Sequence, residues 1–599
     1  MENYLAYVGI DFGTSGITFS YSFDVEKDKK MDIQVKKWEG LGTANKTTTE
    51  IILDKNLEDI LAFGKNECHQ MIHNGIKDGL HFSNIKMNLY KDQLDITDNS
   101  FKGKFKLEKV ISKFLERIRD EAIKELQSKK IDFQKLNLDE SLKKIKWILT
   151  VPAIWSDKSK DCMLKAAKLA RLIKDDEDPS NFFALEPEAA ACNYVMSNEA
   201  EEIVLNSPYI ICDLGGGTAD ITTHERKLDK NGNKIIAEIY PPTGGAHGSR
   251  EINEFIMKKL IPKEVKERIE EILKEGGEES EELQSELRIL ENDINEFKHL
   301  FKSGKINDKH LINIEVLKSG FKDKEPELEE LVNNFNNDPD ISEDCKISIK
   351  NKKKWILNFP YKIIYYLIKK LIVDETIKYI NEIINYLRNS TKNKKEIKTI
   401  ILVGGMSANH SILELFQEAL PDISIVSMVE PEIAVVKGAI YFAKNPYSIS
   451  QRMARYSIGI QSVDLWQEKF EKIKEAQKVW VEKDNEFKCF NKFSPFYKKF
   501  HSINVLGKGK YREFDMFSNH CKIEFYKSDY NGPVYIVGQL DENGKCMTEK
   551  FGNLEFEVDD FDEKEPTLSI TVKLGGTFIV AEIEYLKTKK KSIHTFSFE

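Results

Sequence analysis

Two segments of the chain share one pattern of apolar and polar positions. The first, AYVGIDFGTSGITFSYSF, starts at residue 6, and the second, YIICDLGGGTADITTHE, starts at residue 209. In each, an apolar run ends at an aspartate, a short turn rich in glycine and hydroxyl residues follows, and apolar positions then return with a period of two. Because no helical spacing follows the turn, the pattern predicts two β-hairpins.

Further apolar runs alternate with helical patterns along the chain. The run at 147–151 predicts a strand, and the stretch from about Asp157 predicts a helix. A third strand is predicted in TIILVGG, followed by a helix capped by Ser407 or Asn409. Residues 355–379 predict a long amphipathic helix. Strands that alternate with helices are typical of α/β architecture.

The pattern changes after Pro446. SISQRMARYSIGI at 448–460 is typical of a linker, and the stretch from about 464 to 515 is helical or irregular at first. Beyond it, segments such as HCKIEFY and TLSITVKLGG alternate apolar and polar residues, which predicts half-buried antiparallel strands. We therefore expect the chain to end in a β-rich domain.

Composition and charge narrow the classes of function. Of 599 residues, 41% are hydrophobic and 32% are charged, and the net charge of −9 is unlike the basic excess of a general nucleic-acid binder. The sequence shows no signal peptide and no membrane span, and its eight cysteines form no CxxC pair. We expect a cytoplasmic protein with no nucleic-acid partner, and the lysine run at 587–592 leaves nuclear access open.

The two predicted turns carry the residue types that hold phosphate groups. Glycine lets a phosphate approach the backbone and its N–H groups, and hydroxyl side chains add further donors. These residues are Gly13, Thr14 and Ser15 in the first turn and Gly215, Gly216, Gly217 and Thr218 in the second. Asp11 and Asp213 each end the strand before a turn, where they would hold a hydrated Mg²⁺ between them. Facing each other, the hairpins would clamp the β- and γ-phosphates of a nucleotide.

Several motifs together resemble the actin-like ATPase superfamily and, within it, the heat shock 70-kilodalton protein family. They are CDLGGGTADIT, ILVGGMSANHSI, ALEPEAAACNYV and PEIAVVKGAIYFA, and the resemblance covers about residues 5–446. The divergent 12A/12B branch of that family looks closest, because FSNIKMNLY, ISQRMARYSIGI and the final GGTFIVAEIEY resemble that branch.

The resemblance implies an α/β, two-lobed actin-like ATPase fold with ribonuclease H-like lobes, followed by a smaller β-rich C-terminal domain. Lobe I would comprise residues 1–205, with 427–446 returning to it, and lobe II residues 206–426, with a helical insertion at about 255–305. The C-terminal domain would comprise residues 447–599. The implied ligands are ATP or ADP and Mg²⁺.

The resemblance also implies roles for individual residues. Asp11 and Asp213 would hold Mg²⁺ through water. The residues implied in catalysis are Lys86, Glu186, Asp213 and Thr218. The residues implied in nucleotide binding are Gly13, Thr14, Ser15, Gly215, Gly216, Gly217, Thr218, Gly244, Gly245, Lys298, Gly404, Gly405 and Glu432. The implied reaction is in-line attack of water on the γ-phosphate, catalysed by positioning and charge stabilisation.

The chain departs from the family pattern at several positions. Met406 and Ala408 stand where the family has serine and a basic residue, and no short acidic linker follows Pro446. Three functions therefore stay open. The first is a slow Mg²⁺-dependent ATPase that acts as a chaperone-like switch for a protein client or signalling partner. The alternatives are a catalytically inactive nucleotide-binding scaffold and a sugar kinase of the same superfamily, although no sequence context marks a sugar-facing aspartate base.

One further segment, GLGTANKT at 40–47, nearly matches a phosphate-binding Walker A loop. Asn45 stands where that motif requires glycine, and the same residue breaks a match to G-x-G-x-x-G. The segment is therefore predicted to be a surface turn.

Overall fold

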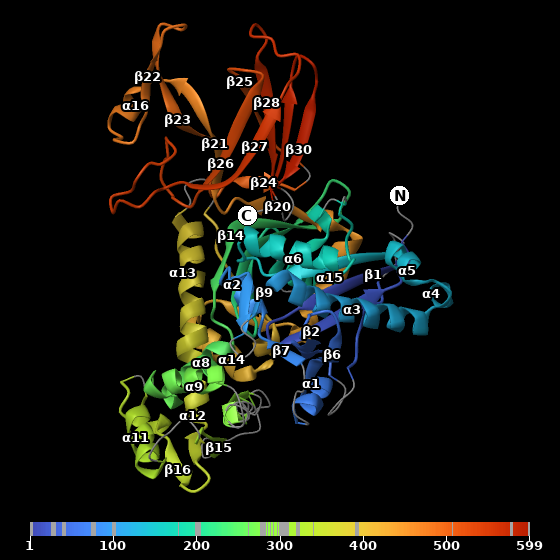
Figure 1. Cartoon of the computed structure of the whole chain (residues 1–599), viewed down its shortest axis with the longest axis vertical. Coiled ribbons are helices and arrows are strands. Elements are labelled where there is room, and N and C mark those ends of the chain that lie inside the picture. The colour runs from blue at the N-terminus through green and yellow to red at the C-terminus, as the bar shows by residue number, and fades with distance from the viewer. Residues whose placement is uncertain are drawn as a thin grey trace.

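The computed structural model consists of several β-sheets with helices packed on and between them (Figure 1). In Figure 1 the N-terminal strands are blue, the middle of the chain is green to yellow, and the C-terminal sheets are orange to red at the top. The structure describes residues 4–596 except 25–30, 39–43, 74–78, 99–102, 176, 178, 198–204, 262, 276–278, 280–282, 284–285, 288, 292, 296–297, 299–310, 319–323, 340, 390–393, 506 and 575–578.

The first large sheet is built around the N-terminal hairpin. In order, its strands are β11 (Phe183–Leu185), β10 (Ile145–Val151), β1 (Ala6–Phe12), β2 (Gly16–Ser22) and β3 (Gln34–Val35), with β4 (Thr47–Thr48) paired to β2. β1 is antiparallel to β2 and parallel to β10, and all its residues are buried. The helices α3 (Leu107–Lys129) and α6 (Asp157–Leu169) pack together, and their apolar residues belong to the same core as β1 and β2.

The second large sheet repeats this arrangement around the second hairpin. In order, its strands are β19 (Ser424–Ser427), β18 (Thr399–Val403), β12 (Pro208–Leu214), β13 (Ala219–Leu228), β14 (Lys234–Gly245), β20 (Ile449–Met453) and β24 (Ser502–Asn504). β12 is antiparallel to β13 and parallel to β18. Both predicted hairpins are therefore confirmed. The predicted cap Asn409 is confirmed as well, since it accepts the Ser411 N–H at the start of α14 (His410–Ala419).

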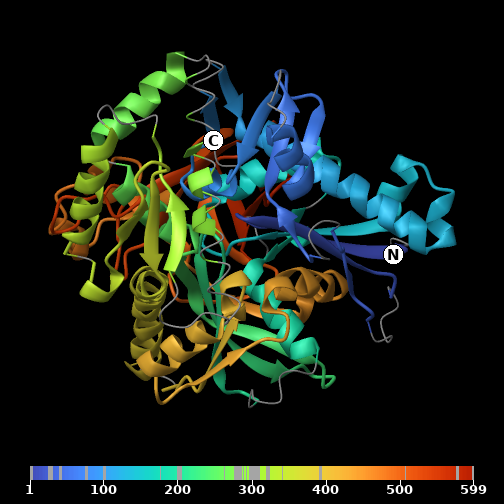
Figure 2. The same ribbon diagram turned by 90° about the horizontal axis from the view of Figure 1, so that it is seen from below.

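Two helices join the sheets. α7 (Glu186–Met196) and α15 (Ala434–Lys444) pack on each other, and they share one apolar core with strands of both sheets. Figure 2 shows α15, in orange, between the blue strands of the first sheet and the green strands of the second. The helices cross closely because Gly438 has no side chain. A Cβ atom there would lie 1.7 Å from the Ala189 carbonyl oxygen.

The middle of the chain adds helices and a small sheet beside the second large sheet. The elements are α8 (Arg250–Leu260), α9 (Lys263–Glu275), β15 (Leu311–Glu315), α11 (Lys324–Asn336), β16 (Ser348–Asn351), β17 (Ile356–Pro360), α12 (Lys362–Leu367), a π-helix (Ile368–Val373) and α13 (Asp374–Asn389). The prediction of a helix from residue 355 is wrong in its first part. Ile356–Pro360 pairs as a strand with β15 and β16, and the helix begins only after Pro360.

Two antiparallel sheets follow β20. One contains β22 (Lys478–Val481), β23 (Glu486–Tyr497), β21 (Ser457–Leu465), β26 (His520–Ser528) and β27 (Glu549–Glu557), and the other β25 (Lys510–Asp515), β28 (Thr567–Lys573), β29 (Val580–Tyr585) and β30 (Lys591–Thr595). They pack on a shared apolar core. The linker predicted at 448–460 is wrong, because this stretch forms β20 and the start of β21. The stretch 464–515 has only one helical turn, α16 (Glu468–Glu471), among its described elements and is otherwise mainly strands.

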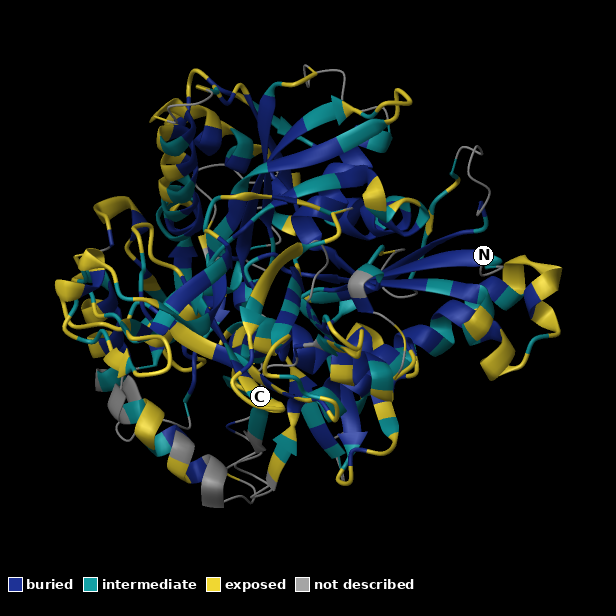
Figure 3. Cartoon of the chain, turned by 90° about the horizontal axis from the view of Figure 1, so that it is seen from above, coloured by how far each residue is buried: buried dark blue, intermediate teal, exposed yellow. Residues whose placement is uncertain are grey.

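The remaining elements come from the first 150 residues of the chain. They are β5 (Glu50–Asp54), β6 (Ile60–Phe63), α1 (Gly64–His73), β7 (Gly79–Ser83), α2 (Lys86–Tyr90), β8 (Asp95–Asp98), β9 (Gly103–Lys106), α4 (Ile131–Gln134) and α5 (Leu138–Lys144). Figure 3 shows that the strands of the large sheets are mostly buried and the outer helices partly exposed. Over the described part of the chain, every helix is too short or too polar to cross a membrane. The predicted mixed α/β class is confirmed, and the division into two lobes and a C-terminal domain stays a prediction.

Candidate functional site

The turns of the two hairpins touch each other. Each is tight: Gly13 N–H donates to the Gly16 carbonyl at 3.1 Å, and Gly215 N–H to the Thr218 carbonyl at 2.9 Å. At Gly216 a Cβ atom would lie only 2.3 Å from Ser15 Oγ. The second turn therefore needs glycine to approach the first this closely.

Gly217 makes the same kind of approach at a neighbouring point. A Cβ atom on it would lie 2.6 Å from Thr14 Oγ1 and 2.4 Å from the sulfur of Met87. Thr14 and Gly217 are buried, whereas Ser15 remains exposed. The structure thus brings together the glycines and hydroxyl groups that the sequence predicted to surround phosphate.

Two aspartates lie behind the turns, at the ends of the central strands. Asp11 is the next-to-last residue of β1 and Asp213 the next-to-last residue of β12, and both are buried. Gly404, with φ of +88°, packs against Asp213, since a Cβ there would lie 2.3 Å from Asp213 Oδ1. Across the second hairpin, Asp213 is in register with Asp220, which is also buried. The site therefore gathers acids that have been removed from water.

Burial raises the pKa values of three acids of the site, Asp213, Asp220 and Glu186. Burial is the main cause for Asp213, followed by the negative charges of Asp220 and Asp11. Burial likewise raises the pKa of Asp220, although the Thr218 hydroxyl donates to its carboxylate. Burial also raises the pKa of Glu186, against the opposing charge of Lys86. These acids therefore carry more negative charge than the neighbouring positive charges balance, and a bound cation would reduce that imbalance.

Lys86 and Glu186 form a buried ion pair at the same place. Lys86 opens α2, Glu186 opens α7, and the Nζ–Oε1 distance is 2.5 Å. The Lys86 ammonium also lies over the Trp155 ring, 5.6 Å from its centroid. Helix and ring together fix the lysine beside the acids, where the sequence predicted a water-positioning residue.

The other predicted nucleotide-binding residues lie around this centre. Gly244 and Gly245 end β14 opposite Asp220 and Ala219, and Gly244 has φ of +143°. Lys298 donates to the Ser249 carbonyl at 3.3 Å, and burial lowers its pKa to about 8.

On the opposite edge, Gly405 follows Gly404 in a short 3-10 helix, with open space where its Cβ would be. Glu432 is partly buried in the turn Pro431–Ile433, whose Pro431 carbonyl accepts the Gly404 N–H at 2.9 Å. Both residues lie beside the Asp213 end of the second sheet rather than at the two touching turns.

Sequence reasoning missed two charged residues of the site. The position of Asp220 could have been predicted from the sequence, because the register of the second hairpin places it directly opposite Asp213. Lys46 lies 2.5 Å from Asp11, measured from Nζ to Oδ2, and comes from the segment that was predicted to be a surface turn. No local pattern marks Lys46, since a separate strand pairing delivers it.

A hydrated Mg²⁺ fits this set of residues. In the part of the chain that the structure describes, no three His, Cys, Asp or Glu side chains gather closely enough to ligate a metal directly. Mg²⁺ usually keeps several waters and takes one or two carboxylates plus phosphate oxygens. Asp11 and Asp213, both buried at the ends of neighbouring hairpins, are the residues that would hold it through water.

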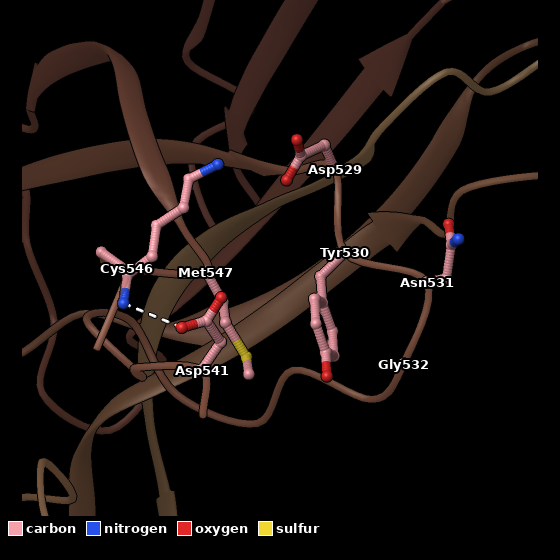
Figure 4. A pocket seen from close by; sticks show the side chains of 8 residues that line it. Asp529, Tyr530, Asn531, Gly532, Asp541, Cys546 and Met547 are labelled. Atoms are coloured by element: carbon pink, nitrogen blue, oxygen red, sulfur yellow. Dashed lines mark hydrogen bonds between the residues drawn. The ribbon is translucent and has the colours of Figure 1, made fainter. Parts of the chain in front are cut away.

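A surface pocket lies far along the chain, among the C-terminal strands. This surface pocket, of about 400 Å³, is lined by Asp529, Tyr530, Asn531, Gly532, Asp541, Lys545, Cys546 and Met547 (Figure 4). The Asp541 carboxylate accepts the backbone N–H groups of Asn543 and Lys545. That carboxylate therefore holds its own turn, and the pocket lacks the buried acids of the hairpin site.

Comparison of the sequence with known proteins finds one family model and several curated relatives. A family model described as "Domain of unknown function (DUF8340)" matches residues 206–430. Heat shock 70 kDa protein 12A of Homo sapiens is 26% identical over 323 residues, which cover 44% of this chain and 46% of that protein, and the Mus musculus protein gives the same values. Heat shock 70 kDa protein 12B of Homo sapiens is 26% identical over 307 residues, 40% and 42% of the two chains. The predicted resemblance to the 12A/12B branch of the heat shock 70-kilodalton family is confirmed.

The match is partial on both sides. The chain matches less than half the length of these curated relatives. The family model, in turn, covers the strands β12, β13, β14, β18 and β19 of the second sheet and the middle of the chain, but not β20, β24 or the first hairpin. The activity and partners of the whole relatives are therefore carried to this chain only as proposals.

Proposed function

We propose that this chain binds Mg·ATP between the two hairpin turns, hydrolyses it slowly and uses the nucleotide as a conformational switch. The observation that carries the proposal is the contact of the glycine turn 215–217 with Thr14 and Ser15, directly in front of Asp11 and Asp213. Backbone N–H groups, hydroxyls and carboxylates in this order form a site for a metal-bound polyphosphate. The similarity to heat shock 70 kDa protein 12A supports the same conclusion.

The chemistry would be in-line transfer of the γ-phosphoryl group to water. Mg²⁺, when held through water by Asp11 and Asp213, supplies neutralisation of the phosphate charge. The turn glycines and the Thr14, Ser15 and Thr218 hydroxyls orient the phosphates. Lys86, fixed by Glu186 at 2.5 Å, positions the attacking water. Most of the rate would come from positioning and charge stabilisation.

The proposed switch uses the architecture of two similar sheets joined by helices. We assign an actin-like lobe I to residues 1–205 and 427–446, a lobe II to 206–426 and a β-rich domain to 447–599. A nucleotide that contacts both hairpins binds a closed arrangement of the lobes better than an open one, and this difference in affinity drives closure. The C-terminal sheets then present a surface to a protein client or signalling partner in the cytoplasm.

Titration calorimetry with Mg·ATP and Mg·ADP tests the proposal, followed by single-turnover hydrolysis. The wild-type protein should bind at micromolar affinity or better. Asp213→Asn should bind at least about tenfold more weakly, because it removes one charged metal-water ligand. Asp422→Asn, which changes an exposed aspartate, is the matched control.

The outcomes separate the competing functions. Binding without hydrolysis would assign the chain to nucleotide-stabilised scaffolds. ATP consumption that depends on an added sugar would favour the kinase alternative. Failure of the wild-type protein to bind either nucleotide would overturn the proposal.

A further inference from the structure

Lys46 reaches the candidate site by a route that is unrelated to a Walker A loop. The described end of the GLGTANKT segment enters β4, which pairs antiparallel with β2 at Gly16 and Ile17, and then continues into the strand β5 rather than into a helix. A Walker A loop needs a helix directly after it, so that reading fails here.

Two hydroxyl groups tie this segment to the first hairpin. Thr18 Oγ1 donates to the Asn45 carbonyl at 2.6 Å, and Thr49 Oγ1 donates to the Gly13 carbonyl at 2.7 Å. These contacts flank Lys46 on both sides. The backbone that carries the lysine is therefore held against the first phosphate turn.

The side chain of Lys46 crosses Gly16 to reach Asp11. A Cβ atom on Gly16 would lie 3.3 Å from Lys46 Cβ and 3.4 Å from Lys46 Cδ, so the glycine leaves room for the aliphatic stem. The ammonium then lies 2.5 Å from Asp11 Oδ2, and the two side chains are 28% and 6% exposed. The Lys46 ammonium, on a partly exposed side chain, therefore lies against the buried carboxylate of Asp11.

The contact between Lys46 and Asp11 affects the balance of charge at the site. Four acids, Asp11, Glu186, Asp213 and Asp220, face two lysines, Lys46 and Lys86. Lys46 is the lysine in contact with Asp11, and Lys86 is the lysine in contact with Glu186. When all six groups are ionised the site keeps two uncompensated negative charges, which one divalent cation would neutralise.

We propose that Lys46 is a tethered cation of the phosphate site, which neutralises Asp11 while neither metal nor nucleotide is bound and contacts the phosphate oxygens of a nucleotide when one is bound. The phosphate contact of Lys46 rests on the proposed function. The competition of Lys46 with divalent cations for Asp11 does not depend on that function. A lysine on a flexible stem suits both positions, because it acts as a point charge and needs no fixed geometry.

The test uses the full chain with Lys46→Met, which keeps the stem and removes the charge, and Lys46→Arg, which keeps the charge. Lys37→Met is the matched control, because Lys37 is a neighbouring lysine bound to the Asn45 side chain and not to the acids. Two quantities are measured by calorimetry: Mn²⁺ affinity of the nucleotide-free protein, and ATP affinity with EDTA present. Thermal unfolding confirms that each variant is folded.

Lys46→Met should bind Mn²⁺ at least about fivefold more tightly than wild type, because the competing charge is gone. It should also lose about tenfold in affinity for metal-free ATP, the effect of one lost charge-assisted hydrogen bond. Lys46→Arg and Lys37→Met should stay within about threefold of wild type in both measurements.

The outcomes keep the two hypotheses apart. If wild type binds Mg·ATP and Lys46→Met matches it in both measurements, the role of Lys46 is overturned and the proposed function stands. If no form binds ATP, the proposed function fails, and the Mn²⁺ measurement alone decides whether Lys46 competes for Asp11. If Lys46→Met does not fold, Lys46→Gln takes its place in the test. The proposed role of Lys46 is overturned if Lys46→Gln binds Mn²⁺ and metal-free ATP as wild type does.

Discussion

At the scale of single residues, the ion pair of Lys86 and Glu186 separates catalysis from binding. Both side chains are less than a tenth exposed, so neither charge is tolerated there without the other. Removal of one partner of a buried pair costs about 3–5 kcal/mol, because the remaining charge is left in a dry environment. A substitution of Lys86 therefore has an effect on stability that must be measured beside its effect on hydrolysis.

We expect Lys86→Met to lower single-turnover hydrolysis about 100-fold while Mg·ATP affinity stays within about threefold, since a lysine that positions water acts mainly on the chemical step. Glu186→Gln in the same chain should restore the melting temperature but not hydrolysis, because it removes the unpaired buried charge. Lys91→Met, at the exposed end of α2, is the control. Equal loss of binding and hydrolysis would contradict a positioning role.

At the scale of elements, the joint between β14 and β20 holds a buried acid next to an ion pair. Glu238 on β14 accepts the Met453 N–H at 2.7 Å, and Arg452 makes two hydrogen bonds to Glu188 on α7. Burial, with the charge of Glu188, raises the pKa of Glu238 to about 8, although the Met453 N–H and Arg452 oppose this. The folded protein therefore keeps a proton on Glu238 that the unfolded chain releases near its ordinary value of 4.5.

The contribution of this proton to the free energy of unfolding should be present in full below about pH 4.5 and should be lost as the pH rises through about 8. Glu238→Gln keeps the acceptor for Met453 and cannot lose a proton. We expect it to match wild type in urea unfolding at pH 5 and to exceed wild type by on the order of 1–3 kcal/mol at pH 9. Glu542→Gln, at an exposed turn, should leave the pH profile unchanged. A Glu238→Gln protein with the wild-type profile would show that this carboxyl is ionised in the fold.

Local patterns predicted the elements whose signals are local. Apolar runs that end at aspartate and glycine gave both hairpins, and with them the positions of Asp11 and Asp213. The pattern failed at 448–460 because β20 finds its partner about two hundred residues earlier, on β14, and such pairing leaves no local trace. Lys46 was missed for the same reason, since the pairing of β4 with β2 carries it into the site.

At the scale of the whole molecule, the short loop of residues 153–155 connects the candidate site to the C-terminal strands. The Arg455 guanidinium, just after β20, donates to the carbonyl oxygens of Ala153 at 2.6 Å and Ile154 at 3.4 Å. On its other side the loop faces the site. The Ile154 N–H donates to Asp220 at 3.3 Å, and the Trp155 ring lies under Lys86. A change in the position of Asp220 or Lys86 is therefore transmitted through packed groups to the start of the C-terminal sheets.

This connection predicts where nucleotide should alter backbone dynamics. We expect Mg·ATP to change amide hydrogen exchange in 449–453 by at least about threefold while β29 and β30, on the far sheet, stay unchanged. Arg455→Gln should abolish the change in 449–453 and leave Mg·ATP affinity within about threefold, because Arg455 has no contact with the hairpin turns among the described residues. Arg512→Gln, which removes an arginine that binds a carbonyl within the C-terminal sheets, should retain the response. If exchange in 449–453 responds to Mg·ATP equally in Arg455→Gln and wild type, the loop 153–155 does not carry the coupling, and the signal must pass through α7 and its Glu188–Arg452 pair instead.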